Sequence, residues 1–60
     1  MGWQVHYQRG DQLFSARAAD RKTAITVACI LLRDGHDVVR LESAECEKID
    51  RDEIKRLCER

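Results

Sequence analysis

The chain has 60 residues, of which 11 are basic and 11 acidic, so its formal net charge is zero. The charges are scattered along the chain, which leaves no basic or acidic block to attract nucleic acid or an anionic membrane surface. A hydrophobic content of 43% is typical of a folded domain. The length predicts a single domain, residues 1–60, near the lower size limit for folding without a disulfide, a metal or a partner.

Cysteine usage and apolar segments give an expectation for the compartment. Cys29, Cys46 and Cys58 make an odd number without a C-x-x-C pair, so we expect neither a disulfide framework nor a zinc site. Reduced thiols and a cytoplasmic location are the simplest interpretation. The long apolar stretch at residues 24–32 is too short to span a bilayer, and we expect no association with a membrane.

Residues 3–18 predict a β-hairpin with one buried face. Trp3, Val5 and Tyr7 alternate with polar residues, which indicates a half-buried strand. Gly10-Asp11 suits a two-residue loop, because glycine adopts the positive φ that type I′ and II′ turns need. This loop pairs the inward, apolar residues of the two strands as follows: Tyr7 with Phe14, Val5 with Ala16, and Trp3 with Ala18.

A helix is predicted after Asp20, whose carboxylate can accept hydrogen bonds from the backbone N–H groups of the first turn. The residues at 24–32 give it a broad apolar face, and Gly35 closes it in the left-handed conformation. Cys29 lies at the edge of the apolar face, and Ile30 projects on the polar side. Simple exposure of Ile30 and its contact with the C-terminal helix or a second subunit both stay open.

A third strand is predicted over residues 38–41, with Val39 and Leu41 as its inward pair. The chain can then pair back through a three-residue loop at 44–46, which would place Ile49 opposite Leu41. That loop lacks the glycine that such turns favour, so the sequence leaves the fourth strand uncertain.

A last helix is predicted from Asp50, which forms a D-x-x-E capping box with Glu53. The element order predicts an α+β fold, in which a small antiparallel sheet (ββαββα order, fourth strand uncertain) carries its helices on one face. A right-handed crossover from the second strand passes over the first, so we expect the first and third strands to be neighbours.

A resemblance is carried by Trp3, by the helix with Ala24, Ala28, Leu31, Leu32 and Gly35, by Val38-Val39-Arg40-Leu41, and by Ile49. In these residues the chain resembles short uncharacterised bacterial domains that share a hairpin, an alanine-rich helix closed by glycine, and a second hairpin. Members commonly have Asp-Gly or a similar glycine in the last turn, where this chain has Ala44-Glu45-Cys46. The domains have no known activity, so the resemblance implies a fold and a bacterial origin.

The sequence offers no recognisable catalytic, cofactor or metal motif. His6 and His36 are not a pair by their spacing, and the carboxylates at 45–53 lack the ligand spacing of an EF-hand loop. We therefore expect no enzymatic activity, no cofactor and no metal.

Two functions stay open. The first is a non-enzymatic protein-interaction module, either a homodimer or bound to an unidentified protein partner, with Leu13, Cys29 and Ile30 as its possible interface. The alternative is a nucleic-acid-binding domain that uses the polar, open sheet face. The candidate residues on that face are Gln4, His6, Gln8 and Arg17. Zero net charge and a lack of aromatic side chains for base stacking on that face make nucleic acid the less favoured partner.

Overall fold

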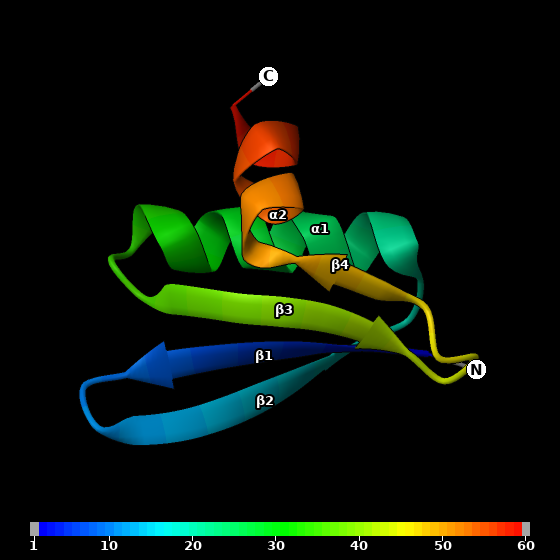
Figure 1. Cartoon of the computed structure of the whole chain (residues 1–60), viewed down its shortest axis with the longest axis horizontal. Helices are drawn as coiled ribbons and strands as arrows, with labels where there is room; N and C mark the ends of the chain where they lie inside the picture. The colour runs from blue at the N-terminus through cyan, green and yellow to red at the C-terminus, as the bar shows by residue number, and fades with distance from the viewer. Residues whose placement is uncertain (1, 60) are drawn as a thin grey trace.

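The computed structural model describes residues 2–59 and has the predicted α+β fold (Figure 1). The elements, in chain order, are β1 (Trp3–Arg9), β2 (Gln12–Ala18), α1 (Arg21–Arg33), β3 (Asp37–Ser43), β4 (Lys48–Asp50) and α2 (Arg51–Cys58). The four strands form an antiparallel sheet in the order β2-β1-β3-β4. The first and third strands are therefore neighbours, as expected from the crossover.

The first hairpin has the register predicted from its loop. Gly10 adopts a φ of 61°, and Trp3 lies opposite Ala18, as Tyr7 does opposite Phe14. Because β1 pairs with β2 on one side and with β3 on the other, it is a central strand although it comes first in the chain. Its residues 3 and 5 are buried accordingly.

Strand β3 corrects one prediction. Val38 and Leu41 are both fully buried, whereas Val39, predicted to point inward with Leu41, is only half-buried. The register of β1 on β3 shifts between His6 and Tyr7, which leaves Val39 as the extra residue of a β-bulge. The prediction assumed that side chains alternate strictly between the two faces along the strand. One added residue interrupts the alternation, so the residues before it point to the opposite faces from those predicted.

The fourth strand, which the sequence left uncertain, is present, and Ile49 lies opposite Leu41 as predicted. In the preceding turn, Cys46 takes a φ of 69°, the left-handed conformation that glycine occupies in most such loops. The hydroxyl of Ser43 accepts two backbone N–H groups of this turn, at 3.0 and 3.2 Å. Side-chain hydrogen bonding thus supports a turn whose sequence lacks the usual residue.

Both helices begin at the predicted aspartates. The carboxylate of Asp20 accepts the N–H of Thr23 at 2.7 Å, and that of Asp50 accepts the N–H of Glu53 at 2.9 Å. Helix α1 ends at Arg33, and Gly35 closes it with a φ of 91°. The backbone N–H groups of Gly35 and His36 donate to carbonyls of the last turn.

Both helices cover the same face of the sheet, and the core lies between the two layers. Val5 and Leu41 of the sheet are buried in one cluster with Ala28 of α1, and Ile54 of α2 completes the core where α2 packs on β3 and β4. In Figure 1, α1 runs along the strands while α2 crosses it and extends away from them. The opposite face of the sheet, called the open face below, carries no helix within residues 2–59.

A disulfide joins Cys29 of α1 to Cys58 of α2, with the two Cα atoms 5.4 Å apart. The expectation of three reduced thiols is therefore wrong. An odd number of cysteines still allows one pair, and this pair forms because α2 packs across α1, a long-range contact that cysteine spacing does not show. Cys46 is free and exposed.

Candidate interaction surface

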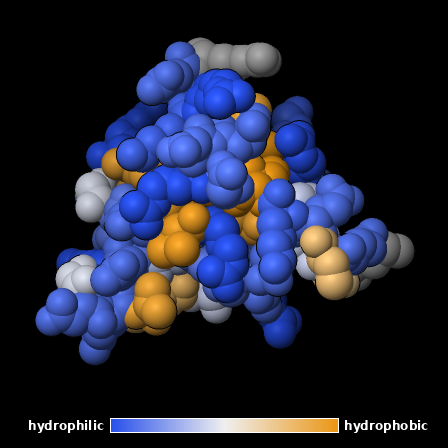
Figure 2. Space-filling view, viewed as in Figure 1, coloured by the Kyte–Doolittle hydropathy of each residue, from blue (hydrophilic) through white to orange (hydrophobic). Residues whose placement is uncertain are grey.

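The large exposed apolar side chains lie in two separate places. Leu13 and Phe14 are adjacent on β2 and are 74% and 39% exposed, and Ile30 on α1 is 50% exposed. Leu13 points to the open face and Phe14 to the helix face, so the two side chains flank the edge of the sheet. In Figure 2, the hydrophobic surface in view is broken into islands among hydrophilic atoms. Leu13 and Phe14 therefore form an exposed apolar edge on β2.

The three residues predicted as an interface do not come together on one surface. Leu13 is on the open face, whereas Ile30 belongs to the helix layer on the other side of the sheet. Cys29 is half-buried and held in the disulfide with Cys58. A single partner on one side of the sheet would reach Leu13 or Ile30, and not both.

Strand β2 is an unprotected edge of the sheet. It pairs with β1 on one side, and no other strand in the described part of the chain pairs with it on the other. It has 7 residues, QLFSARA, with no proline and no bulge, and Arg17 near its end is its one charged side chain. The edge thus offers backbone hydrogen-bonding groups together with apolar side chains.

Phe14 belongs to this surface and was missed by sequence reasoning. Its inward direction was predicted correctly, and its ring stacks on that of Tyr7 with the centroids 5.5 Å apart. The helix layer nevertheless covers little of β2, of which only Ala18 is buried. The signal was available in the strand order: a helix about 10 Å wide covers roughly two strands spaced about 4.8 Å apart, so an outermost strand is left partly uncovered.

The predicted nucleic-acid residues do share the open face. In the observed register, Gln4 lies opposite Arg17, and His6 is two residues along the same strand. Gln8 is on this face too, where its side chain donates to the carbonyl of Gly10 at 3.1 Å. The residues that sequence reasoning grouped on one face are therefore brought together by the sheet.

An acidic side chain interrupts this face. Glu42 Oε1 lies 3.2 Å from His6 Nε2 and 3.7 Å from Arg40 Nε. None of the three side chains is more than half exposed, so Glu42 offsets the cationic character at the centre of the face. The open face is consequently mixed in charge, in contrast to the basic surfaces that bind phosphates.

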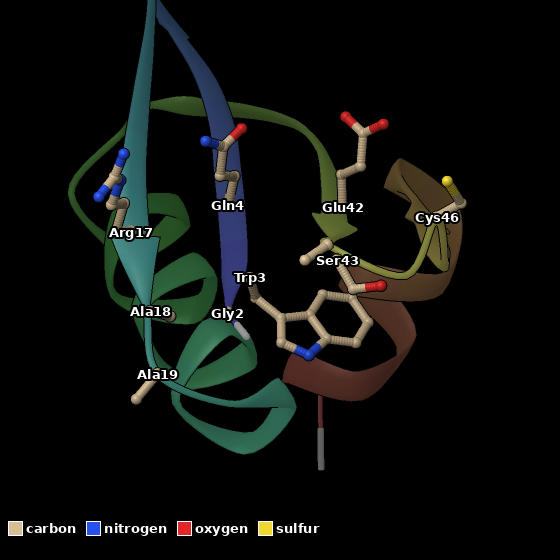
Figure 3. A pocket seen from close by; sticks show the side chains of 10 residues that line it. Gly2, Trp3, Gln4, Arg17, Ala18, Ala19, Glu42, Ser43 and Cys46 are labelled. Atoms are coloured by element: carbon tan, nitrogen blue, oxygen red, sulfur yellow. The ribbon is translucent and has the colours of Figure 1, made fainter.

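A shallow hollow of about 790 Å³ lies at the end of the sheet where β1 begins and β2 and β3 end (Figure 3). The indole of Trp3 lies in its middle, and Gln4, Arg17 and Glu42 line up above it from three neighbouring strands. Within residues 2–59, no group of three or more His, Cys, Asp or Glu side chains is placed to hold a metal ion. No described helix is both long enough and apolar enough to cross a membrane.

The fold and these surfaces define a small α+β domain with a long, apolar, unpaired edge strand. Comparison with protein-family models, with curated proteins and with solved structures found no match. The chemistry of the chain's own surface is therefore what indicates a function.

Proposed function

We propose that the protein is a non-enzymatic protein-interaction module that binds a partner through the open edge of β2. The observation that supports this is the exposure of Leu13 and Phe14 on the two sides of a strand whose outer backbone groups are unpaired. An added strand from a partner would satisfy those N–H and C=O groups and cover both side chains, as in β-strand addition.

The energies favour this edge over the exposed helix residue. Fully burying an exposed leucine side chain contributes about 1.5–3 kcal/mol, and each new backbone hydrogen bond adds about 1 kcal/mol. Phe14 contributes less than Leu13 because it is only 39% exposed in the monomer. The β2 edge offers both terms together, whereas Ile30 offers one exposed side chain on a helix whose own backbone is already paired. Lone exposed isoleucines are common on folded proteins.

Site-specific photocrosslinking in cells of the source organism tests the proposal. A photoreactive amino acid at Leu13 is expected to capture a protein of defined mass. The same amino acid at Thr26, which is exposed on α1, serves as the matched control and is expected to capture none. Equal yields at the two positions, or no crosslinked protein at either, would contradict an interaction through β2.

Nucleic-acid binding is the alternative, and one observation supports it: Gln4, His6, Gln8 and Arg17 share the open face. Glu42 beside His6 weakens the case because it repels phosphate. Fluorescence polarisation with labelled DNA and RNA at low salt separates the two functions. Binding that falls with salt and is reduced by Arg17→Ala would support the alternative.

The cytoplasmic location and the bacterial origin stay predictions. The disulfide weighs against the cytoplasm, where thiols are kept reduced. Thiol labelling of acid-quenched cells, followed by mass measurement, decides between compartments. Labelling of Cys46 alone indicates an oxidising compartment, whereas labelling of all three cysteines supports the cytoplasm.

A further inference from the structure

We propose that the partner is a second copy of this chain, whose β2 pairs antiparallel with β2 of the first, with Phe14 opposite Phe14 at the two-fold axis. This inference rests on the proposed use of the β2 edge and specifies its occupant. In the resulting assembly the two sheets join into one, and because the axis is perpendicular to the sheet, both copies carry their helices on the same side.

The direction of the free backbone groups restricts the register. Along an antiparallel ladder, hydrogen-bonded residue pairs alternate with pairs that exchange no hydrogen bond, called bonded and non-bonded pairs below. Arg9 and Gln12 close the two-residue loop and form a bonded pair. The N–H and C=O groups of Leu13, Ser15 and Arg17 therefore point to the open edge. A second β2 can pair only where these residues meet one another.

The register centred on Phe14 satisfies this condition. Leu13 of each copy lies opposite Ser15 of the other as a bonded pair, and the two Phe14 residues form a non-bonded pair. Side chains approach most closely at non-bonded pairs, so the two phenyl rings meet on the helix face. The two Leu13 side chains become diagonal neighbours on the open face, within reach of each other.

Charge complementarity favours the same register. Asp11 belongs to the loop directly before β2, and continuing the register one residue past the strand brings it beside Arg17 of the other copy, so a symmetric dimer gains two pairs of opposite charge. Among the salt bridges formed within residues 2–59, none uses either side chain. Both groups are therefore available to a partner.

The two neighbouring registers are poorer in both respects. When Leu13 lies opposite Leu13, Phe14 faces Gln12 and Asp11 faces Ser15. When Ser15 lies opposite Ser15, Arg17 faces Leu13 and Phe14 faces Ala16. That arrangement places a charged group against an apolar one and leaves the two phenyl rings apart. The Phe14-centred register is the one that covers both exposed apolar side chains and pairs both charges.

A charge-swap experiment tests the register directly. Arg17→Glu and Asp11→Lys each place like charges opposite one another in the homodimer, whereas an equimolar mixture of the two variants restores two opposite-charge pairs. Dimer mass is measured by analytical ultracentrifugation over a dilution series. Each variant alone is expected to dimerise about tenfold more weakly than the wild type, and the mixture to recover wild-type affinity.

Two further variants complete the experiment. Lys22→Glu makes the same charge change as Arg17→Glu, at an exposed position of α1, and is expected to dimerise like the wild type. Leu13→Lys places a lysine on the edge and is expected to abolish the dimer. Circular dichroism confirms folding of every variant, which separates lost pairing from lost structure.

The outcomes separate this inference from the proposed function. A wild type that stays monomeric up to millimolar concentration, or a mixture no better than its components, overturns self-pairing. If photocrosslinking at position 13 then captures a different protein, the interaction role stands with another occupant. If it captures nothing, both proposals fall.

Discussion

The two edges of the sheet differ in length and in protection. At one edge, β4 has 3 residues, and its last, Asp50, is also the cap of α2, so the chain leaves the sheet almost at once. At the other edge, β2 has 7 residues, and in the described part of the chain no strand pairs with its outer side. A short edge strand that leads directly into a helix offers few backbone groups to another chain. A long edge strand with an unpaired outer side offers a full row of N–H and C=O groups for pairing.

The two edges are also held in different ways. Ile49 of β4 is buried, and α2 beyond it is fixed through Ile54 in the core and through the disulfide. β2 is held chiefly by its neighbour β1 and by the stacking of Phe14 on Tyr7. This chain thus secures one edge of its sheet by long-range contacts and leaves the other edge to local ones.

Removing the disulfide is expected to have the largest effect on the protected edge. The bond closes a loop with a sequence separation of 29, for which loop-closure entropy gives about 3.5 kcal/mol of unfolding free energy. Urea unfolding of the Cys29→Ser/Cys58→Ser double variant measures this loss, with Cys46→Ser as the matched control. Equal midpoints for the two would show that the protected edge owes nothing to the crosslink.

A pair of leucine truncations compares the interior with the open edge. Leu41→Ala removes a fully buried side chain of β3 and is expected to lower the unfolding free energy by about 3 kcal/mol. Leu13→Ala, at a position that is 74% exposed, is expected to cost less than about 0.5 kcal/mol in the monomer. Denaturation is measured on dilute protein to avoid association. A large loss at Leu13 would mean that β2 is structurally secured after all.

The two hairpin turns give opposite expectations. Cys46→Gly relieves a side chain held at a φ of 69° and is expected to raise the unfolding free energy by about 0.5–1 kcal/mol. Gly10→Ala introduces the same strain at a φ of 61° and is expected to lower it by about 1 kcal/mol. Cys46→Ala controls for loss of the thiol and is expected to be neutral. Stability is measured by thermal unfolding. If Cys46→Gly and Gly10→Ala change the stability in the same direction, this account is wrong.

The smallest effect concerns pH and the helix that follows β2. The backbone hydrogen bond from Thr23, helped by the threonine side chain, lowers the pKa of the Asp20 carboxyl. The folded state thus binds this proton less readily than the unfolded chain. The stabilisation is complete above the ordinary aspartate pKa and is lost as the pH falls through the lower folded-state value. Asp20→Asn retains the cap and is expected to flatten this part of the acid unfolding profile; an unchanged profile would exclude the assignment.

Local chemistry in the sequence was sufficient for much of the fold. Gly10-Asp11 determines the register of the first hairpin, and Asp20 and Gly35 mark the ends of α1. The grouping of Gln4 and Arg17 on the open face followed from that register. Each of these features depends on residues close together in the chain, where spacing alone carries the information.

What the sequence did not predict depends on contacts between distant elements. The bulge at Val39 arises from pairing with β1, and a bulge adds one residue without any required side chain. The Cys29–Cys58 bond depends on how α2 crosses α1. The exposure of Phe14 depends on how far the helix layer extends. None of these is encoded in a spacing.

The central position of β1 has a consequence for the order of folding. Each hairpin joins neighbouring segments of the chain. At the seam where β1 pairs with β3, by contrast, Val5 lies opposite Leu41, and the whole of α1 separates these two residues in the sequence. Local contacts form quickly, and a pairing that closes a long loop forms slowly. We expect the two hairpins to form first and their joining to limit the rate. Trp3, which lies at the end of this seam opposite Ser43, is placed to report that step by its fluorescence.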